Sequence, residues 1–388
     1  MILHDIFGGL AILSFCLLLW QWLAARRFPL HQRAAPSSFA PAVTLLKSLK
    51  GADAATEDCL RSWFAQEYRG EMQILFGVVS ADDPVCAIVK KLTREFPTRD
   101  VQLGVFPALI GTNAKVSKLA ELERLAKHEI LVISDADVRV PADFLANAVA
   151  PLQAPDVGLV NCFYRLANPA TLAMHWEAVA INADFWSQVL QSQTLKPLDF
   201  ALGAVMLTRR ARVAEIGGFK SLADCLADDY QLGHRIARNG HRIVLTPVVV
   251  ECWDPPMTWR AVWKHQLRWA RTIRVSQPAP YFFSILSNAG FWALLWFAIG
   301  LVEMRASAPR LPIAVILGGL LILLRIVIAE ALQFRLTRSA ASVGYFWLVP
   351  VKDVLQAAIW LGAFAGNQIE WRGQVFRLQR DGTLAKAK

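Results

Sequence analysis

The strongest constraint on the fold is an uncharged apolar run near the start of the chain, residues 6–25 (IFGGLAILSFCLLLWQWLAA). A helix rises about 1.5 Å per residue, so twenty residues match a hydrocarbon core about 30 Å thick. In a signal peptide the basic residues would precede the run, whereas Arg26, Arg27 and Arg33 follow this one. Basic residues gather on the cytoplasmic side. We therefore predict a transmembrane helix within residues 1–30, with the following residues in the cytoplasm.

The composition agrees with a membrane protein. Hydrophobic residues make up 55% of the chain and charged residues 19%, and there are 14 Trp. This excludes a disordered chain and argues against an ordinary soluble enzyme. The net charge of +10 indicates anionic lipid or a phosphorylated substrate as partner. No nucleic-acid-binding motif is present, so nucleic acid is not an expected partner. The six scattered Cys form no C-x-x-C pair and are predicted to be reduced.

Between residues 43 and 250, short apolar runs alternate with charged helical stretches. Such alternation indicates a mostly parallel sheet with helices on both faces, in which ligands bind at the carboxyl ends of the strands. The predicted strands are 43–49, 72–79, 101–106, 129–137 and 157–163, and the predicted helices are 56–67, 84–96, 114–127 and 141–152.

The chain becomes basic and aromatic after residue 250. Residues 259–275 (WRAVWKHQLRWARTIRV) predict an amphipathic helix on the membrane surface, with Trp259 and Trp263 on one face. A second aromatic stretch, residues 174–190, is predicted either to border the site where a lipid substrate enters or simply to pack in the core.

Three further apolar segments follow, and the first is a clean candidate span. Four spans would place the basic tail outside, against the charge rule, so we expect one of the last two segments to be re-entrant or interfacial. The segments are 281–302, 311–334 with Arg325 and Glu330, and 343–366 with Lys352 and Asp353.

Carboxylates follow two of the predicted strands. Asp135 and Asp137 form a D-x-D turn after ILVIS, and such hard oxygen ligands suit Mg²⁺ or Mn²⁺, which in turn binds a diphosphate. A solvated turn or a helix cap is the alternative. Asp82 and Asp83 follow MQILFGVV in the same way, and Pro84 suits the first position of a helix. One of these aspartates can cap that helix while the other binds a ligand.

Three motifs lie at or on predicted helices. GTNAK (111–115) opens a helix with a Gly-containing turn and Lys115, which is a plausible anion site. Asp228 and Asp229 open another helix, where the helix dipole also favours acids as simple caps. HQLRW (265–269) lies on the amphipathic helix, where snorkelling basic residues are the alternative explanation.

The order of these motifs, with a membrane helix before them and several after, resembles the membrane-bound inverting glycosyltransferases of family two and the ceramide glucosyltransferase relatives of family twenty-one. The bacterial hopanoid-biosynthesis glycosyltransferases belong to the same group. The resemblance covers roughly residues 5–300 and is carried by LLKSLKG (45–51), DDP (82–84), GTNAK (111–115), DDY (228–230) and LRW (267–269).

The sequence departs from the family pattern at three positions. His265 stands where Gln or Arg is usual, and Asp228 stands where many members have Glu. Asp137 completes the D-x-D, whereas ceramide glucosyltransferases often lack this second acid. Asp137 and the compact length favour a bacterial member, and a hopanoid polyol over ceramide as the acceptor.

The resemblance implies an α/β fold: a GT-A-type nucleotide-sugar-binding domain, with a mostly parallel sheet, plus α-helical transmembrane segments. It implies transfer of glucose or N-acetylglucosamine from a UDP-sugar to a lipid hydroxyl, with inversion. The implied roles are Asp229 as catalytic base with Asp228 beside it, Asp137 and Asp135 as ligands of Mg²⁺ or Mn²⁺, Asp82, Asp83 and Asp135 at the nucleoside, and Lys115, His265, Gln266, Arg268 and Trp269 at the rest of the donor.

The implied organisation is that of a multi-pass protein of the bacterial inner membrane with a cytoplasmic catalytic domain. Two other functions stay open: a processive polysaccharide synthase of the same superfamily, and a non-catalytic membrane protein that binds nucleotide or lipid. The predicted parts are a membrane helix in 1–30, the catalytic domain 36–258, the interfacial helix 259–280, membrane or re-entrant helices in 281–370 and a basic tail, 371–388.

Overall fold

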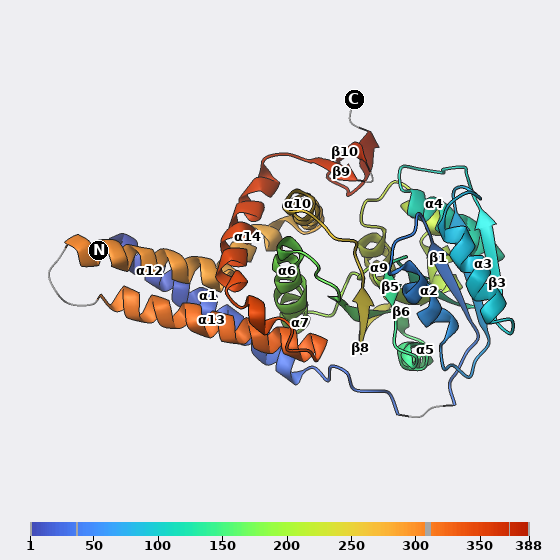
Figure 1. Ribbon diagram of the computed structural model, residues 1–388, viewed down its shortest axis with the longest axis horizontal. Coiled ribbons are helices and arrows are strands. Elements are labelled where there is room, and N and C mark those ends of the chain that lie inside the picture. The colour runs from blue at the N-terminus through green and yellow to red at the C-terminus, as the bar shows by residue number, and fades with distance from the viewer. Residues whose placement is uncertain (1, 36–37, 307–311, 372, 387–388) are drawn as a thin grey trace. The chain divides into compact units, whose positions relative to one another are not determined.

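The computed structural model describes residues 2–35, 38–306, 312–371 and 373–386, and these fold into two units (Figure 1). The remaining residues, which fall in the predicted N-terminal helix, linker, membrane region and tail, lie outside the described residues. We call the units the helical unit and the sheet unit. The helical unit comprises 1–28, 169–195 and 256–381, and the sheet unit comprises 29–168, 196–255 and 382–388.

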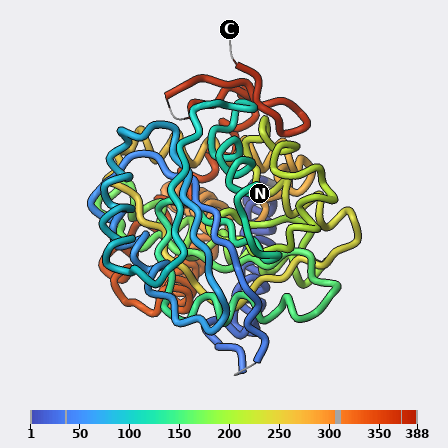
Figure 2. Tube along the Cα trace, turned by 90° about the vertical axis from the view of Figure 1, so that its right-hand side faces the viewer, coloured from blue at the N-terminus to red at the C-terminus, as the bar shows by residue number. Residues whose placement is uncertain are grey.

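The sheet unit contains an eight-stranded mixed sheet with the order β3-β2-β1-β4-β7-β6-β8-β5. The β3-β2-β1-β4 half is parallel throughout, and Figure 2 shows its chain in blue to cyan. The β6–β8 pair is also parallel, whereas β7 runs antiparallel to β4 and β6. The strands are β1 (Val43–Ser48), β2 (Met72–Val78), β3 (Asp100–Val105), β4 (Ile130–Ser134), β5 (Val138–Arg139), β6 (Val157–Leu166), β7 (Val205–Arg209) and β8 (Arg242–Cys252).

All five predicted strands are present. β2 and β4 are buried along their whole length, which is why they appear in the sequence as continuous apolar runs. β5, β7 and β8 were not predicted. β5 has only two residues, and β8 contains Pro247, a residue that argues against a strand when only the sequence is considered. The predicted α/β fold class is confirmed, with β7 making the sheet mixed.

Helices flank this sheet at the predicted places. Apolar side chains of α2, Trp63 and Phe64, are fully buried, and Phe64 stacks on Phe76 of β2. The predicted helix 141–152 is shorter, because it ends in a 3₁₀ turn, Ala150–Gln153. The helices are α2 (Thr56–Phe64), α3 (Val85–Glu95), α4 (Ala114–Leu125), α5 (Phe144–Val149), α8 (Arg210–Glu215) and α9 (Asp228–Arg238).

In the helical unit, α1, α12 and α13 pack side by side (Figure 1). A continuous helical stretch, 172–193, consists of α6, a π-helical turn (Ala180–Phe185) and α7. The C-terminal segment adds the hairpin strands β9 and β10. The elements are α1 (Ile2–Arg27), α6 (Leu172–Val179), α7 (Trp186–Gln193), α10 (Trp259–Ser276), α11 (Pro278–Phe283), α12 (Ala289–Ala306), α13 (Ile313–Thr337), α14 (Leu348–Phe364), β9 (Gln368–Trp371) and β10 (Gln374–Leu378), and β11 (Leu384–Lys386) belongs to the sheet unit.

Two helices in the described part of the chain are long and apolar enough to cross a membrane, Leu3–Arg27 and Ile313–Thr337. The prediction of one clean helix over 281–302 is wrong, because α11 and α12 meet at a 47° bend. Asn288 explains the bend: its backbone leaves the helix, and its side-chain oxygen accepts a hydrogen bond from Phe291 N at 3.2 Å, as an N-cap does. The bent pair counts as a third span only if taken together.

Candidate active site

Lys115 joins three of the motifs. Its Nζ lies 2.7 Å from Oδ1 of Asp135, which directly follows β4, and 3.1 Å from Oδ2 of Asp228, the first residue of α9. Burial favours the neutral amine, but Asp135, Asp228 and Asp229 together raise the pKa of Lys115 above its usual value. The side chain is therefore a fixed cation at the centre of an acidic cluster, and three separately predicted site segments meet there.

Asn113 holds two of these segments in register. Its side-chain oxygen caps α4 by accepting hydrogen bonds from the backbone of Lys115 (3.0 Å) and Val116 (3.2 Å). Its amide donates to Cys225 O at 2.9 Å and to Asp228 Oδ1 at 3.3 Å. Asn113 is fully buried. Asn113 lies within the predicted GTNAK motif, but no role was predicted for it.

Asp229 has the electrostatics of a base that works near neutral pH. Burial, together with the adjacent Asp228, raises its pKa to about 6, although the cation of Lys115 acts in the opposite direction. Its Oδ1 accepts a hydrogen bond from Tyr230 N at 2.8 Å. A Cβ at Gly203 would lie 2.5 Å from Asp229 Oδ2, so only glycine leaves room for the carboxylate as placed. Sequence reasoning missed Gly203, since nothing local marks it.

Asp137 belongs to a second cluster of acidic side chains, with Asp135 and Asp254. Burial, followed by the neighbouring charges of Asp135 and Asp254, raises the pKa of Asp137 to about 7. The nearby Lys47 is buried too, and that burial lowers its pKa to about 8. Lys47 donates hydrogen bonds to Ser134 Oγ, at 3.0 Å, and to the backbone oxygen of Asp135. Lys47 and Asp254 were not predicted as site residues.

These carboxylates suit a hard divalent cation. Burial and, after it, the like charges of Asp135 and Asp254 disfavour the ionised form of Asp137, and a dication would favour that form. No group of three or more His, Cys, Asp or Glu side chains is preassembled as a metal cage in the described ranges. Mg²⁺ needs only one or two protein carboxylates when phosphate oxygens and water complete its shell. Asp135 and Asp137 therefore fit a cation that arrives with a phosphorylated ligand.

Asp83 and Asp82 differ in their surroundings. Both carboxylate oxygens of Asp83 lie 3.0 Å from the backbone N–H of Gly51, and Oδ1 also accepts from Val85 N at 3.1 Å. Asp83 thus ties the loop after β1 to the start of α3. Asp82 is exposed at the same strand end. The N-cap residue of α3 is Pro84, so neither aspartate is the cap itself, and Asp83 instead holds the backbone of Val85 from one residue further out.

The HQLRW motif lies on α10 in the helical unit. Nδ1 of His265 and Nε2 of Gln266 each lie 2.8 Å from the same oxygen, Oε1 of Glu177 on α6. The imidazole also meets the ring of Trp269 edge-on, with centroids 4.8 Å apart. Arg268 lies on the same helix and is half-buried. Glu177 was not predicted, because a buried acid within an apolar stretch gives no local signal of its partners.

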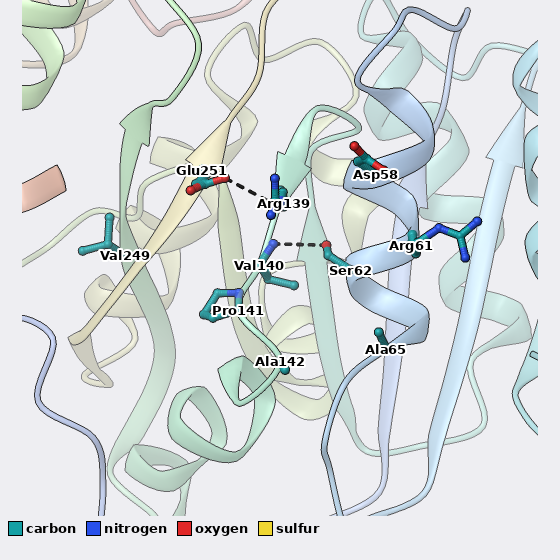
Figure 3. Close-up of a pocket in the computed structure, with 10 residues that line it drawn as sticks. All are labelled: Asp58, Arg61, Ser62, Ala65, Arg139, Val140, Pro141, Ala142, Val249 and Glu251. Atoms are coloured by element: carbon teal, nitrogen blue, oxygen red, sulfur yellow. Dashed lines mark hydrogen bonds and ion pairs between the residues drawn. The ribbon is translucent and has the colours of Figure 1, made fainter. Parts of the chain in front are cut away.

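A separate hollow of about 520 Å³ lies in the sheet unit, where α2 faces the segment from Arg139 to Ala142 and β8 (Figure 3). Arg139 and Glu251 form an ion pair at 3.7 Å across it. It includes no predicted site residue. Of its charged side chains, Arg139 and Glu251 pair with each other and Arg61 pairs with Glu57 and Glu95, so we assign the chemistry to the Lys115 cluster instead.

Comparison with known proteins decides the family. The model of glycosyl transferase family 21 matches residues 7–384. The chain belongs to glycosyl transferase family 21. The predicted resemblance to the family 2/21 enzymes is thereby confirmed.

Curated relatives of this family 21 chain are ceramide glucosyltransferases. Ceramide glucosyltransferase 3 of Caenorhabditis elegans is 22% identical over 240 residues, which cover 61% of this chain and 51% of that protein. Ceramide glucosyltransferase of Candida albicans is 35% identical over 121 residues, 28% of this chain and 22% of that protein. The chain thus spans about half, or less, of the length of these two relatives.

A solved structure shares the fold of the family 21 chain. The mannosyltransferase PcManGT from Pyrobaculum calidifontis, in complex with GDP-Man and Mn²⁺, aligns with a TM-score of 0.55 and 21% sequence identity. The alignment covers 92% of this chain and 99% of that one. The likeness supports the predicted GT-A-type architecture of the sheet unit.

Proposed function

We propose that this family 21 chain transfers a hexose from a nucleotide sugar to the hydroxyl of a membrane lipid, with inversion at the anomeric carbon. The observation that carries the proposal is the acidic cluster around Lys115, with Asp229 at the start of α9 and a pKa of about 6. The candidate spans give the same chain access to a lipid substrate.

Asp229 is the proposed general base. A lipid alcohol has a high pKa, and a carboxylate whose own pKa is near neutral is a better proton acceptor than an ordinary exposed aspartate. As the lipid oxygen bonds to the anomeric carbon, its proton goes to Asp229, and the bond between that carbon and the diphosphate oxygen breaks. The nucleoside diphosphate then leaves with the electron pair.

The leaving diphosphate requires positive charge. Lys115 supplies one fixed cation, and the HQLRW motif with Arg268 is the other proposed contributor. Mg²⁺ or Mn²⁺ held by Asp135 and Asp137 would neutralise the remaining charge on the diphosphate. Asp83 and Asp82 are the proposed contacts for the nucleoside.

The donor and the acceptor are the finer parts of the proposal. The donor is UDP-glucose or UDP-N-acetylglucosamine. Asp137 favours a hopanoid polyol as acceptor, whereas the names of the curated relatives favour ceramide. The three arginines after the first span favour a cytoplasmic location for the sheet unit, and Asp137 together with the compact length favours a bacterial inner membrane.

The test is UDP release by the purified full-length protein in detergent, with Mg²⁺ or Mn²⁺. Each donor is offered with ceramide, with a hopanoid polyol or without lipid. Lipid-dependent release, lost by at least about 10²-fold in Asp229→Asn, supports the proposal. The control Asp156→Asn removes a charge from an exposed side chain whose ion pair, in the described part of the chain, is with Arg242, and it should leave the rate unchanged.

The mass of the product separates the remaining alternatives. A single added hexose agrees with the proposal, whereas a ladder of hexoses indicates a polysaccharide synthase. Release that no lipid stimulates, or that persists in Asp229→Asn, contradicts the proposal and favours another reaction or another base, whereas no release with any donor favours the non-catalytic function.

A further inference from the structure

Two neighbouring side chains on α6 carry buried polar atoms without a partner in the described part of the chain. They are the indole nitrogen of Trp176, a donor, and Oε2 of Glu177, an acceptor. The Trp176 residue is 0% exposed and the Glu177 side chain 1% exposed. Buried polar groups are almost always paired, because an unpaired one loses its hydrogen bonds to water without gaining a replacement. An unpaired donor and an unpaired acceptor at adjacent positions therefore point to a bound group that would pair with both.

Glu177 cannot satisfy Oε2 by turning. Its other oxygen, Oε1, accepts a hydrogen bond from Gln266 Nε2 at 2.8 Å, and rotation of the carboxylate would break it. Nδ1 of His265 lies equally close to Oε1 but makes no hydrogen bond in the described structure, so it is a third buried polar atom without a partner at this point. Gln266 and His265 both come from α10, the helix that carries the family motif. The acid is thus held by one oxygen while the other stays available to a ligand.

The surroundings are aromatic. The ring of Trp176 stacks on Trp259, with centroids 5.7 Å apart, and on Trp263, at 6.4 Å. Trp259 is 45% exposed although it is a large apolar side chain. Indole rings combine an apolar face with one polar donor and are favoured where apolar chains meet polar groups. This composition suits a molecule with a hydrocarbon part and a polar end.

We propose that Glu177 and Trp176, both in the helical unit, bind the polar head of the acceptor lipid through one of its hydroxyls. This hydroxyl donates to Glu177 Oε2, and an oxygen of the same head accepts from the Trp176 indole. Hydroxyl groups supply both functions, whereas a carbonyl would serve only the indole and an ammonium only the carboxylate. The inference rests on the proposed lipid glycosyltransferase function and adds to it the site that selects the acceptor.

The test compares Glu177→Gln and Trp176→Phe in the full-length protein in lipid nanodiscs. Each variant should raise the KM for the acceptor about tenfold, because about 1.4 kcal/mol of hydrogen bonding corresponds to a factor of ten. The KM for the donor and the slow hydrolysis of the UDP-sugar by water should stay unchanged. Trp20→Phe is the matched control, since it removes an indole of the same unit that lies outside this aromatic group, on α1, and should change the acceptor KM less than twofold.

A second comparison uses an acceptor analogue in which one non-nucleophilic hydroxyl is replaced by hydrogen. The wild-type protein should prefer the parent lipid by at least about tenfold, and Glu177→Gln should lose most of that preference. A preference that survives in both variants overturns the inference. Donor hydrolysis that falls together with transfer also overturns it, because the residues would then only support the structure.

Failure of the proposed function is recognised separately. If the wild-type protein glycosylates no lipid, the equilibrium binding of radiolabelled ceramide and hopanoid polyol to wild type and Glu177→Gln is measured instead. Weaker binding of one lipid by the variant supports the site, and equal binding by both proteins overturns it.

Discussion

Lys115 faces three carboxylates with a single positive charge. Two of them, Asp135 and Asp228, contact its Nζ directly, so the third, Asp229, is left with less of the cation's field. Burial then decides the protonation of Asp229, and its pKa lies near 6. Burial, more than the cation of Lys115, thus sets the pKa of the proposed base.

This arrangement predicts the pH dependence of the reaction. The proposed base acts only when ionised, so the rate of UDP release should rise with pH through about 6 and level off above it. Lys115 lowers the pKa of Asp229, so Lys115→Met should move this limb to higher pH. Rate profiles between about pH 5 and pH 8 measure both effects. A limb that stays in place in Lys115→Met would contradict the coupling.

The same shift affects stability with the opposite sign. The raised pKa of Asp229 means that the folded state holds this proton more tightly than the unfolded state does. Its contribution to stability is therefore full below about pH 4 and is lost as the pH rises through about 6. The ionised form of Asp229, which the proposed reaction needs, is thus the form that contributes less to the stability of the folded protein.

Gly203 provides a test of how closely Asp229 is positioned. In Gly203→Ala the new Cβ would meet Oδ2 of Asp229 at 2.5 Å, so the carboxylate must move. We expect transfer to fall by about 10-fold to 10²-fold, as for other small displacements of reacting groups, while donor binding changes little. Gly319→Ala is the control, because its Cβ meets only ordinary contacts at 3.5 Å or more. Unchanged turnover in Gly203→Ala would show that the Asp229 carboxylate can move without loss of activity.

At the scale of elements, the helical stretch 172–193 explains charges that looked out of place in the apolar segments. Its π-helical turn, Ala180–Phe185, carries Asp184, and Arg325 Nη2 lies 2.8 Å from that carboxylate. Arg325 also contacts Asp353 at 2.9 Å, and Lys352 contacts both acids. The four side chains form a buried, neutral cluster that links the π-helical turn with α13 and α14.

Neutralising one charged side chain of this cluster should destabilise the protein more than neutralising one cation and one carboxylate together. Asp184→Asn leaves a net positive charge buried and should cost about 3–5 kcal/mol. The double variant Asp184→Asn with Lys352→Met restores neutrality and should be more stable than Asp184→Asn alone. Thermal unfolding of the proteins in detergent measures the order. If the double variant is the less stable of the two, charge balance is not what stabilises the cluster.

How much of the structure can be predicted from the sequence depends on how far apart in the chain the interacting residues are. The five apolar strands, the helices between them and α10 were predictable because their patterns are local. The order of the motifs led to the acids around Lys115, which the parallel strands and the start of α9 bring together. The bend at Asn288, the space at Gly203 and the partners of Glu177 depend on residues distant in the chain, and no local pattern reveals them.

At the scale of the whole molecule, the chain passes between the two units several times. The helical unit takes 169–195 from the middle of the chain, inside the span 36–258 predicted as the catalytic domain. Within this unit, Gln21 of α1 donates to Gln191 of α7 at 3.2 Å, so a contact joins residues 170 positions apart. The sheet unit is therefore built from segments that are discontinuous in the sequence, and residues 169–195, which lie between two of them, belong to the helical unit.

This organisation predicts that the sheet unit cannot be produced as a simple fragment. A fragment of residues 29–255 keeps 169–195 but lacks α1, α10, α13 and α14, against which that stretch packs. Trp176 would lose its aromatic partners, and Glu177 and Asp184 would lose the side chains that now pair with them. An apolar helix with exposed indole rings and unpaired acids favours association.

On size-exclusion chromatography we expect the fragment to elute as an aggregate, while the full-length protein in detergent elutes as a single species. A fragment that is monodisperse without detergent would mean that 169–195 can rest on the sheet unit alone, and the division of the chain into these two units would have to be redrawn.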